Sequence, residues 1–294
     1  MRVFVTGAAG FIGTATTAEL IANGHKVLGL ARSDANAKAL EKMGAEVHRG
    51  SLEDLDSLRK GARATDGTIH LAFIHDFSKF AESGQIDKNA IDAMGDALAG
   101  SDKPLIVTSG TLLVSPGRLA TEEDPAMPGL PRVSEIAGLA FAARGVRAMA
   151  VRLPQVHGGD GKCGLVNLFL DNAREKGASA YIGDGANRWS GAHRQDVARL
   201  YRLALEKGLA GKSYHAVADE GVTARDIAEI VGRHLKVPVV SIAPDQAPAH
   251  FGMMAMFAGM DGAASSALTQ KWLGWKPTQI GLIADISRPD YFKV

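Results

Sequence analysis

The strongest constraint on the fold is a glycine turn at the very start of the chain. The segment VFVTGAAGFIG runs from an apolar, β-branched stretch directly into Gly7, Gly10 and Gly13, and a helical pattern follows. Glycine in such a turn permits unusual φ angles and lets the backbone approach a pyrophosphate closely. The following helix offers unpaired N–H groups and a partial positive charge to the phosphates. The turn therefore predicts a dinucleotide site; a tight strand-to-helix turn without a ligand is the alternative.

The rest of the first 153 residues alternates short apolar segments with longer amphipathic ones. This alternation predicts a parallel sheet with helices on both faces. The expected strands are 3–5, 27–30, 45–48, 68–73, 105–108 and 148–153. The expected helices are 11–22, 35–43, 52–60, 87–99 and 133–143. Six such strands complete a doubly wound, Rossmann-type α/β sheet.

After residue 153 the alternation loosens, and a glycine-rich loop spans 158–164. Helices are expected near 165–175, 195–206 and 225–235, with a short strand near 237–242. This part lacks an independent set of strands and is interpreted as a small C-terminal lobe. We therefore expect a dinucleotide-binding core over 1–153 and a mainly substrate-binding lobe over 154–294, packed on the same sheet.

Composition narrows the possible partners. The 294 residues carry a net charge of +1, which gives no global attraction to nucleic acid or to anionic membranes, so neither is expected as a partner. One cysteine, Cys163, excludes an intrachain disulfide, and the chain opens on a strand pattern and not on a leader. A reducing, cytoplasmic location is expected. No apolar run approaches the ~18 residues of a membrane span, and no cluster has metal-site spacing, so no metal is expected.

The end of the second expected strand bears on which dinucleotide binds. The sequence there is GLARS, and neither Ala31 nor Arg32 is acidic. An acidic residue would hold the two ribose hydroxyls of NAD. Arg32 can instead pair with a 2′-phosphate, and Ser33 can add a hydroxyl. NADP is therefore expected in preference to NAD; the alternative is a solvated Arg32, with Asp34 serving the ribose.

Seven segments spread over nearly the whole chain carry a family resemblance. They are TGAAGFIG at 6–13, IHLAF at 69–73, VTSG at 107–110, RLPQVHG at 152–158, GDG at 183–185, HRQDVARLY at 193–201 and LGWKP at 273–277. Together they resemble the short-chain dehydrogenase/reductase superfamily, in its extended branch of NAD-dependent epimerases and dehydratases. The last three segments are similar to the substrate-lobe motifs of that branch.

The glycine turn and the resemblance together imply a set of cofactor-binding residues. They are Gly7, Gly10, Phe11, Ile12, Gly13, Arg32, Ser33, Leu52, Leu71, Ala72, Phe73, Thr108, Leu153 and Pro154. By the resemblance, residues 71–73 would line the cofactor, and Leu153 and Pro154 would flank the nicotinamide. Gln155 stands where the family often has a substrate-binding asparagine, and His157 replaces a tyrosine common in the same motif.

The chain departs from the family at the catalytic position. The family's acid is a tyrosine, followed four residues later by a lysine near the start of the fifth helix. Residues 111–150 contain no tyrosine, lysine or histidine, and Pro131 and Glu135 stand at the two places, judged by Ser134. The departure resembles atypical subgroups of the superfamily that keep the cofactor turn and lose the pair.

Three side chains are the catalytic candidates. At the place of the family's serine, Ser109 and Gly110 both fit and Thr111 comes next, and the hydroxyls of Ser109 and Thr111 could stabilise a developing oxyanion. His75 follows the fourth expected strand and could donate a proton near neutral pH. An ordinary loop histidine is the alternative for His75.

Five further residues are candidates for binding the substrate: Arg132, Gln155, His157, Arg188 and Trp189. Arg132 lies close to the missing tyrosine and could orient a carbonyl or a carboxylate, but its pKa is too high for a proton donor. Arg188 and Trp189 lie near the place where epimerases clamp a substrate phosphate, although Arg188 is one position off.

The expected function is that of an NADP-dependent oxidoreductase, which reduces a small carbonyl compound or oxidises the corresponding alcohol. A non-catalytic NADP-binding sensor is the first alternative. A nucleotide-sugar epimerase or dehydratase is the second, disfavoured by the missing tyrosine and lysine. The resemblance also implies a homodimer through residues 87–99 and 133–143, although core packing accounts for most of the apolar residues there.

Overall fold

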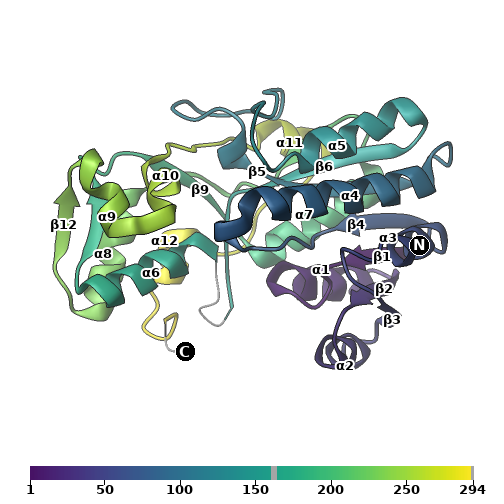
Figure 1. The fold of residues 1–294 in the computed structure, drawn as a ribbon, viewed down its shortest axis with the longest axis horizontal. Coiled ribbons are helices and arrows are strands. Elements are labelled where there is room, and N and C mark those ends of the chain that lie inside the picture. The colour runs from purple at the N-terminus through teal and green to yellow at the C-terminus, as the bar shows by residue number, and fades with distance from the viewer. Residues whose placement is uncertain (160–163, 293–294) are drawn as a thin grey trace.

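A seven-stranded parallel sheet forms the centre of the molecule (Figure 1). The structure is a computed structural model that describes residues 1–159 and 164–292, so Cys163 and most of the expected glycine-rich loop lie outside the described residues. The strand order is β10-β6-β5-β4-β1-β2-β3, which confirms the doubly wound fold. The strands are β1 (Arg2–Thr6), β2 (Lys26–Ala31), β3 (Glu46–Arg49), β4 (Gly67–His70), β5 (Pro104–Gly110), β6 (Arg147–Leu153) and β10 (Ser213–His215).

Helices cover both faces of this sheet because successive side chains of each buried strand point to opposite faces. Val3 and Val5 pack in one core cluster and Phe4 in another, and all three are fully buried. The first face carries α1 (Phe11–Ala22), α2 (Asp34–Lys42) and α7 (Arg194–Lys207). The second carries α3 (Leu55–Arg63), α4 (Phe80–Leu98) and α5 (Ser134–Leu139). No helix in the described part of the chain is long and apolar enough to cross a bilayer.

The sheet differs from the expectation in two respects. The fourth strand ends at His70 and not at Phe73, because beyond His70 the chain leaves its partner β5 and the Ala72 N–H turns to the Thr6 hydroxyl, at 3.3 Å. A seventh strand, β10, comes from the second half of the chain and pairs with β6. With only three residues, β10 is too short to show a period in the sequence.

The lobe lies at one end of the molecule, on the left in Figure 1. The expectation that it lacks its own strands is wrong, because two small sheets are present. One contains β7 (Gln155–His157), β9 (Arg188–His193) and β11 (Asp219–Thr223); the other contains β8 (Ser179–Ile182) and β12 (Val239–Ile242). The helices of the lobe are α6 (Gly164–Lys176), α8 (Ala224–Leu235), α9 (Ala247–Phe251), α10 (Ala255–Gly259) and α12 (Leu282–Ile286), whereas α11 (Ala267–Leu273) packs against α7 and β10 of the core.

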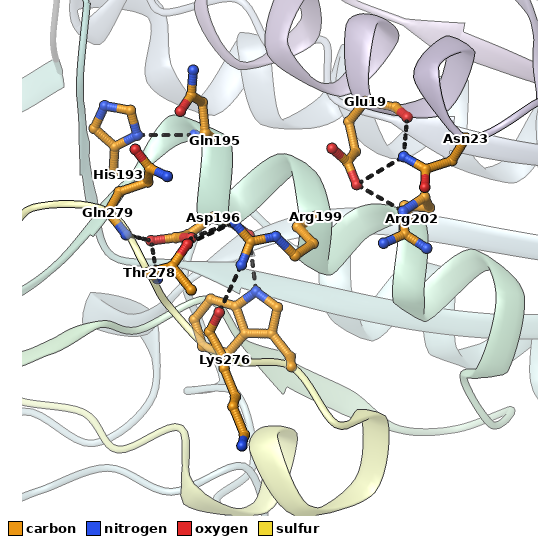
Figure 2. Close-up of polar contacts among 11 residues, drawn as sticks. Glu19, Asn23, His193, Gln195, Asp196, Arg199, Arg202, Lys276, Thr278 and Gln279 are labelled. Atoms are coloured by element: carbon orange, nitrogen blue, oxygen red, sulfur yellow. Dashed lines mark hydrogen bonds and ion pairs between the residues drawn. The ribbon is translucent and has the colours of Figure 1, made fainter.

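The segments HRQDVARLY and LGWKP bind each other, as Figure 2 shows. Asp196 of α7 is fully buried, and its carboxylate accepts the backbone N–H groups of Thr278 and Gln279, both at 3.0 Å. The indole of Trp275 donates to the Asp196 carbonyl at 2.9 Å. One turn further, Arg199 pairs with the Asp196 carboxylate at 3.0 Å. These two motifs thus hold the C-terminal segment against α7.

We expect Asp196→Asn to lower the free energy of unfolding by about 2 kcal/mol, because the amide group would face backbone donors with a donor of its own. Urea unfolding followed by circular dichroism measures the loss. Asp56→Asn is the control, since the Asp56 side chain is 82% exposed and pairs only with Arg59. Equal stability of both variants would contradict a structural role for the contacts between Asp196 and the C-terminal segment.

Candidate cofactor and active site

Each glycine of the turn meets a different steric demand. Gly7 has a φ of +67°, and a Cβ there would lie 2.8 Å from the Ala72 nitrogen. A Cβ on Gly13 would overlap the carbonyl oxygen of Gly7, so Gly13 lets α1 start against the turn. A Cβ on Gly10 would meet only the Gly7 oxygen, at 3.1 Å. Gly10 is therefore the position where an added side chain would project from the turn.

The N-terminus of α1 is open to an anion. Gly10 is its N-cap and supplies no side-chain cap, and the first turn holds no acidic residue. In the described part of the chain, the backbone N–H groups of Phe11, Ile12 and Gly13 have no acceptor. Unpaired donors at a helix start attract phosphate groups. The residues present therefore fit the pyrophosphate of a dinucleotide.

The end of β2 presents one unpaired cation. Arg32 is exposed, and within residues 1–159 and 164–292 it forms no hydrogen bond or ion pair. The Ser33 hydroxyl is engaged as the N-cap of α2, where it accepts the Asn36 N–H at 3.2 Å. Asp34 is paired with Arg49 at 2.7 Å. Arg32 is therefore free to meet a ligand, and the Ser33 hydroxyl, which accepts in its cap contact, still has its proton to donate.

The implied wall residues lie after the strands of the central sheet, where ligands of this fold bind. They are half-buried: Leu52, Leu71, Ala72, Phe73, Leu153 and Pro154. Thr108, in contrast, is buried, and its hydroxyl donates to the His70 carbonyl at 2.6 Å and lies 2.8 Å from the Tyr201 hydroxyl. Burial raises the pKa of Tyr201, so this phenol stays neutral. The Thr108 hydroxyl thus joins β4, β5 and α7.

The two candidate hydroxyls have different surroundings. Thr111, in a 3-10 turn after β5, lies 3.0 Å from the Ser190 hydroxyl and 3.4 Å from the Leu153 carbonyl oxygen. It therefore links the core to the lobe. Ser109 is also buried, but its hydroxyl has no hydrogen-bond partner among the residues that the structure describes. Ser109 lines a small cavity together with Arg132.

Arg132 is anchored on three sides. Its Nη2 donates to the Thr108 carbonyl and its Nε to the Ser134 hydroxyl, both at 3.0 Å. Its guanidinium carbon lies 4.1 Å from the centre of the Phe73 ring, a cation–π distance. Burial lowers the pKa of Arg132, and the Asp87 carboxylate opposes that shift. In the described ranges Nη1 has no protein partner, so one nitrogen is left for a ligand.

The ring of His75 packs edge-on against Phe73, with 5.2 Å between ring centres. Desolvation and the positive charge of Arg132 lower the pKa of His75, against a hydrogen bond with the Phe73 backbone that raises it. His75 is therefore uncharged at pH 7. It reaches the protonated form only at more acidic pH.

The place of the family's lysine holds a buried ion pair. Glu135 accepts hydrogen bonds from Arg152, at 2.9 Å from Nε to Oε2, and from the Ser213 hydroxyl at 2.8 Å. Arg152 also donates to His215 Nε2 at 3.1 Å. Burial and the Arg152 charge lower the pKa of His215, which stays neutral. Glu135 thus holds α5 against β6 and β10 and supplies no amine to the site.

Gln155 and His157 are both buried in β7. The Gln155 side chain donates to the Val156 carbonyl at 3.3 Å. His157 Nδ1 lies 2.8 Å from a carboxylate oxygen of Asp285, which is also buried. His157 therefore joins β7 to α12.

Arg188 and Trp189 contact the segment around residue 260. Arg188 forms a two-pronged pair with Asp261, at 3.0 Å from Nε and 2.8 Å from Nη2. Trp189 is buried and its indole donates to the Met260 carbonyl at 3.2 Å. The structure therefore does not bring these two side chains together with Ser109 and Arg132.

Sequence reasoning missed a buried pair under the site. His70 Nε2 lies 3.0 Å from Asp87 Oδ1, and both side chains are at most 2% exposed. A signal existed in the sequence. Asp87 stands three and four residues before Ala90 and Ile91 on the buried stripe of α4, where a carboxylate is out of place without a partner.

A larger cavity of about 610 Å³ lies elsewhere, between the start of α7 and the C-terminal segment. It is lined by Gly159, His193, Gln195, Gln279, Ile280, Asp285, Arg288 and Asp290. None of the sequence-predicted site residues lines it. No group of three or more His, Cys, Asp or Glu in 1–159 and 164–292 is placed to hold a metal ion.

The fold and this site define a class, the Rossmann-type NAD(P)-binding proteins with a C-terminal lobe. The family model "NAD dependent epimerase/dehydratase family" matches residues 3–93. A protein of Schizosaccharomyces pombe, "Uncharacterized protein C2A9.02", is 46% identical over 99% of this chain and 100% of its own length. The "Sterol-4-alpha-carboxylate 3-dehydrogenase, decarboxylating" of Dictyostelium discoideum is 29% identical over 76% of this chain and 73% of its own.

Among solved structures, DesIV (dTDP-glucose 4,6-dehydratase) from Streptomyces venezuelae superposes with a TM-score of 0.75 at 23% identity. The match covers 99% of this chain and 96% of DesIV, and at this identity it supports the fold. The chain belongs to the NAD dependent epimerase/dehydratase family, within the short-chain dehydrogenase/reductase superfamily. The resemblance predicted from the sequence is confirmed, and the interpretation as an NAD(P)-dependent enzyme agrees with this family.

We expect Gly10→Val to abolish cofactor binding in a protein that still folds, because the added side chain would stand where the pyrophosphate approaches the turn. Gly10→Ala, which adds only a Cβ, is the graded control and should lose less affinity. Titration of each variant with the dinucleotide, alongside its circular dichroism spectrum, checks both points. Undiminished binding by folded Gly10→Val would place the dinucleotide elsewhere.

Proposed function

We propose that the chain is an NADPH-dependent reductase of a small carbonyl compound, which also oxidises the corresponding alcohol. The observation that carries the proposal is the anchored guanidinium of Arg132. Arg132, whose Nη1 has no partner among the described residues, lines the same small cavity as Ser109 and stands one residue from the place of the family's tyrosine. Two such donors can bind a carbonyl oxygen and stabilise the negative charge that develops on it.

When bound, the cofactor supplies the hydride. Arg132 and Ser109 orient the carbonyl and hold its oxygen. The Thr111 hydroxyl, bonded to Ser190, keeps the lobe against this oxygen-binding cavity. The product oxygen takes its proton from water, and at more acidic pH from His75, whose ring packs on Phe73 beside Arg132.

The relatives and the lobe bear on the choice of reaction. The printed name of the Dictyostelium discoideum relative is that of a dehydrogenase, which supports alcohol–carbonyl chemistry. A nucleotide-sugar epimerase is less well supported, because Arg188 is already paired with Asp261 and offers no clamp for a phosphate. A sensor would bind NADPH and never consume it, so a lasting absence of turnover with carbonyl compounds would favour that alternative.

The preference for NADP over NAD is part of the proposal. It rests on Arg32, an exposed and unpaired guanidinium at the end of β2, and on the engagement of Asp34 by Arg49. A carboxylate held by an arginine is less available to the ribose hydroxyls of NAD. A free guanidinium can make paired hydrogen bonds with a 2′-phosphate.

Arg32→Ala should weaken NADPH binding by ~10-fold to ~100-fold and leave NADH binding unchanged, because one charge-assisted contact is lost. Fluorescence titration with both cofactors measures the change. Arg63→Ala is the control, since Arg63 is also an exposed arginine but lies in the last turn of α3. An unchanged preference in Arg32→Ala, or a wild type that prefers NADH, would refute this assignment.

The double variant Ser109→Ala, Thr111→Val should lower carbonyl turnover at least ~10²-fold while NADPH affinity holds, because the oxygen loses the Ser109 donor and the lobe loses its hydrogen bond to Thr111. NADPH oxidation at 340 nm with a panel of aldehydes and ketones measures the rate. Ser101→Ala, which removes a hydroxyl from the loop before β5, is the control. Full turnover in the double variant would mean that the oxygen is held by other groups.

A further inference from the structure

Arg132 stands at one end of a row of hydrogen-bonded polar side chains that is otherwise buried. Its Nε donates to the Ser134 hydroxyl at 3.0 Å, and that hydroxyl lies 2.5 Å from Asp87 Oδ2. Because a guanidinium only donates, Ser134 accepts from Arg132 and must give its own proton to Asp87. Ser134 and Asp87 are each 2% exposed. The carboxylate of Asp87 therefore sets the direction of the bonds that hold the guanidinium.

The chain continues from Asp87 to the glycine turn. Asp87 Oδ1 lies 3.0 Å from His70 Nε2, and His70 Nδ1 lies 2.7 Å from the Thr6 hydroxyl. The Thr6 oxygen in turn accepts the Ala72 N–H at 3.3 Å. With the His70 proton on Nε2, every donor in this row meets an acceptor.

The charges of the row are balanced. Burial acts to raise the pKa of Asp87, but the hydrogen bonds from His70 and Ser134 and the charge of Arg132 hold it below its usual value. Asp87 is thus an anion that faces a cation across one hydroxyl. A buried ion pair of this kind contributes little net stability but fixes orientation when all its hydrogen bonds are made.

The two ends of the row lie at the two halves of the site. Thr6 directly precedes Gly7, and the Ala72 nitrogen is the atom that a Cβ on Gly7 would strike. At the other end, Arg132 lines the cavity of Ser109. A shift of the turn on cofactor binding would reach Arg132 through four buried side chains, those of Thr6, His70, Asp87 and Ser134.

We propose that Asp87 is a positioning residue that aims Arg132 at the substrate oxygen and couples its orientation to the glycine turn. This inference rests on the proposed function for its effect on turnover. Its structural content, the fixed orientation of Arg132, does not depend on turnover.

The test is Asp87→Asn, which keeps the size of the side chain but replaces one acceptor by a donor. We expect kcat to fall at least ~10-fold, because small misplacements of a binding group are costly, while the Kd for NADPH changes less than twofold. Asp92→Asn is the control on the same helix, since Asp92 is partly exposed and pairs only with Lys88. In an Arg132→Met background, Asp87→Asn should cause no further loss.

A second measurement needs no turnover. The Nε–H resonance of Arg132, identified by its absence in Arg132→Met, should exchange slowly with solvent and should shift when NADPH binds. Asp87→Asn should speed the exchange, and Thr6→Val should abolish the NADPH-induced shift. Thr65→Val is the control for Thr6→Val, since Thr65 is also buried and its hydroxyl donates to the α3 carbonyls of Gly61 and Ala62.

The outcomes separate the two proposals. If the wild type reduces no carbonyl compound, the proposed function fails, and the exchange of the Arg132 Nε–H alone decides whether Asp87 positions it. Unchanged exchange in Asp87→Asn overturns the inference. A loss of kcat that adds in full to that of Arg132→Met would also overturn it, because Asp87 would then act independently of Arg132.

Discussion

The structure depends on the contact between the glycine turn and the start of α1. Because Gly13 has no side chain, α1 begins directly against the Gly7 carbonyl, and its open N-terminus points along the edge where the strands end. The same helix packs along α7, where Arg202 reaches Glu19 at 2.7 Å (Figure 2). The absence of a side chain at Gly13 therefore fixes both the phosphate site and the position of α1, which packs along α7.

Two arginines near the site have different roles because their surroundings differ. Arg152 is fully buried and saturated by Glu135, His215 and backbone carbonyls, so it serves the packing of α5 on the sheet. Arg132 is held by Ser134, the Thr108 carbonyl and the Phe73 ring, but its Nη1 has no partner among the described residues, and the residue lines a small cavity. In the proposed function, this division of roles replaces the family's tyrosine and lysine, and a guanidinium takes over the binding of an oxygen.

Much of the core could be predicted because its signals are local. The glycine turn, the buried strands and the free Arg32 each show in a few adjacent residues. Contacts between distant segments could not be predicted. No residue near Arg188 in the sequence indicates that it pairs with Asp261, and β10 is too short to show the alternation of a strand. The Asp87–His70 pair could be predicted only in part, because the sequence shows a carboxylate on a buried helix face but does not show its partner.

A crystal structure with NADP⁺ bound tests the central claim most directly, by showing which polar side chains face C4 of the nicotinamide. The account predicts that Arg132 Nη1 and the Ser109 hydroxyl are the donors within hydrogen-bond reach of a carbonyl oxygen placed there. A nicotinamide ring that faces another polar group, such as His157, with Arg132 out of reach, would contradict it.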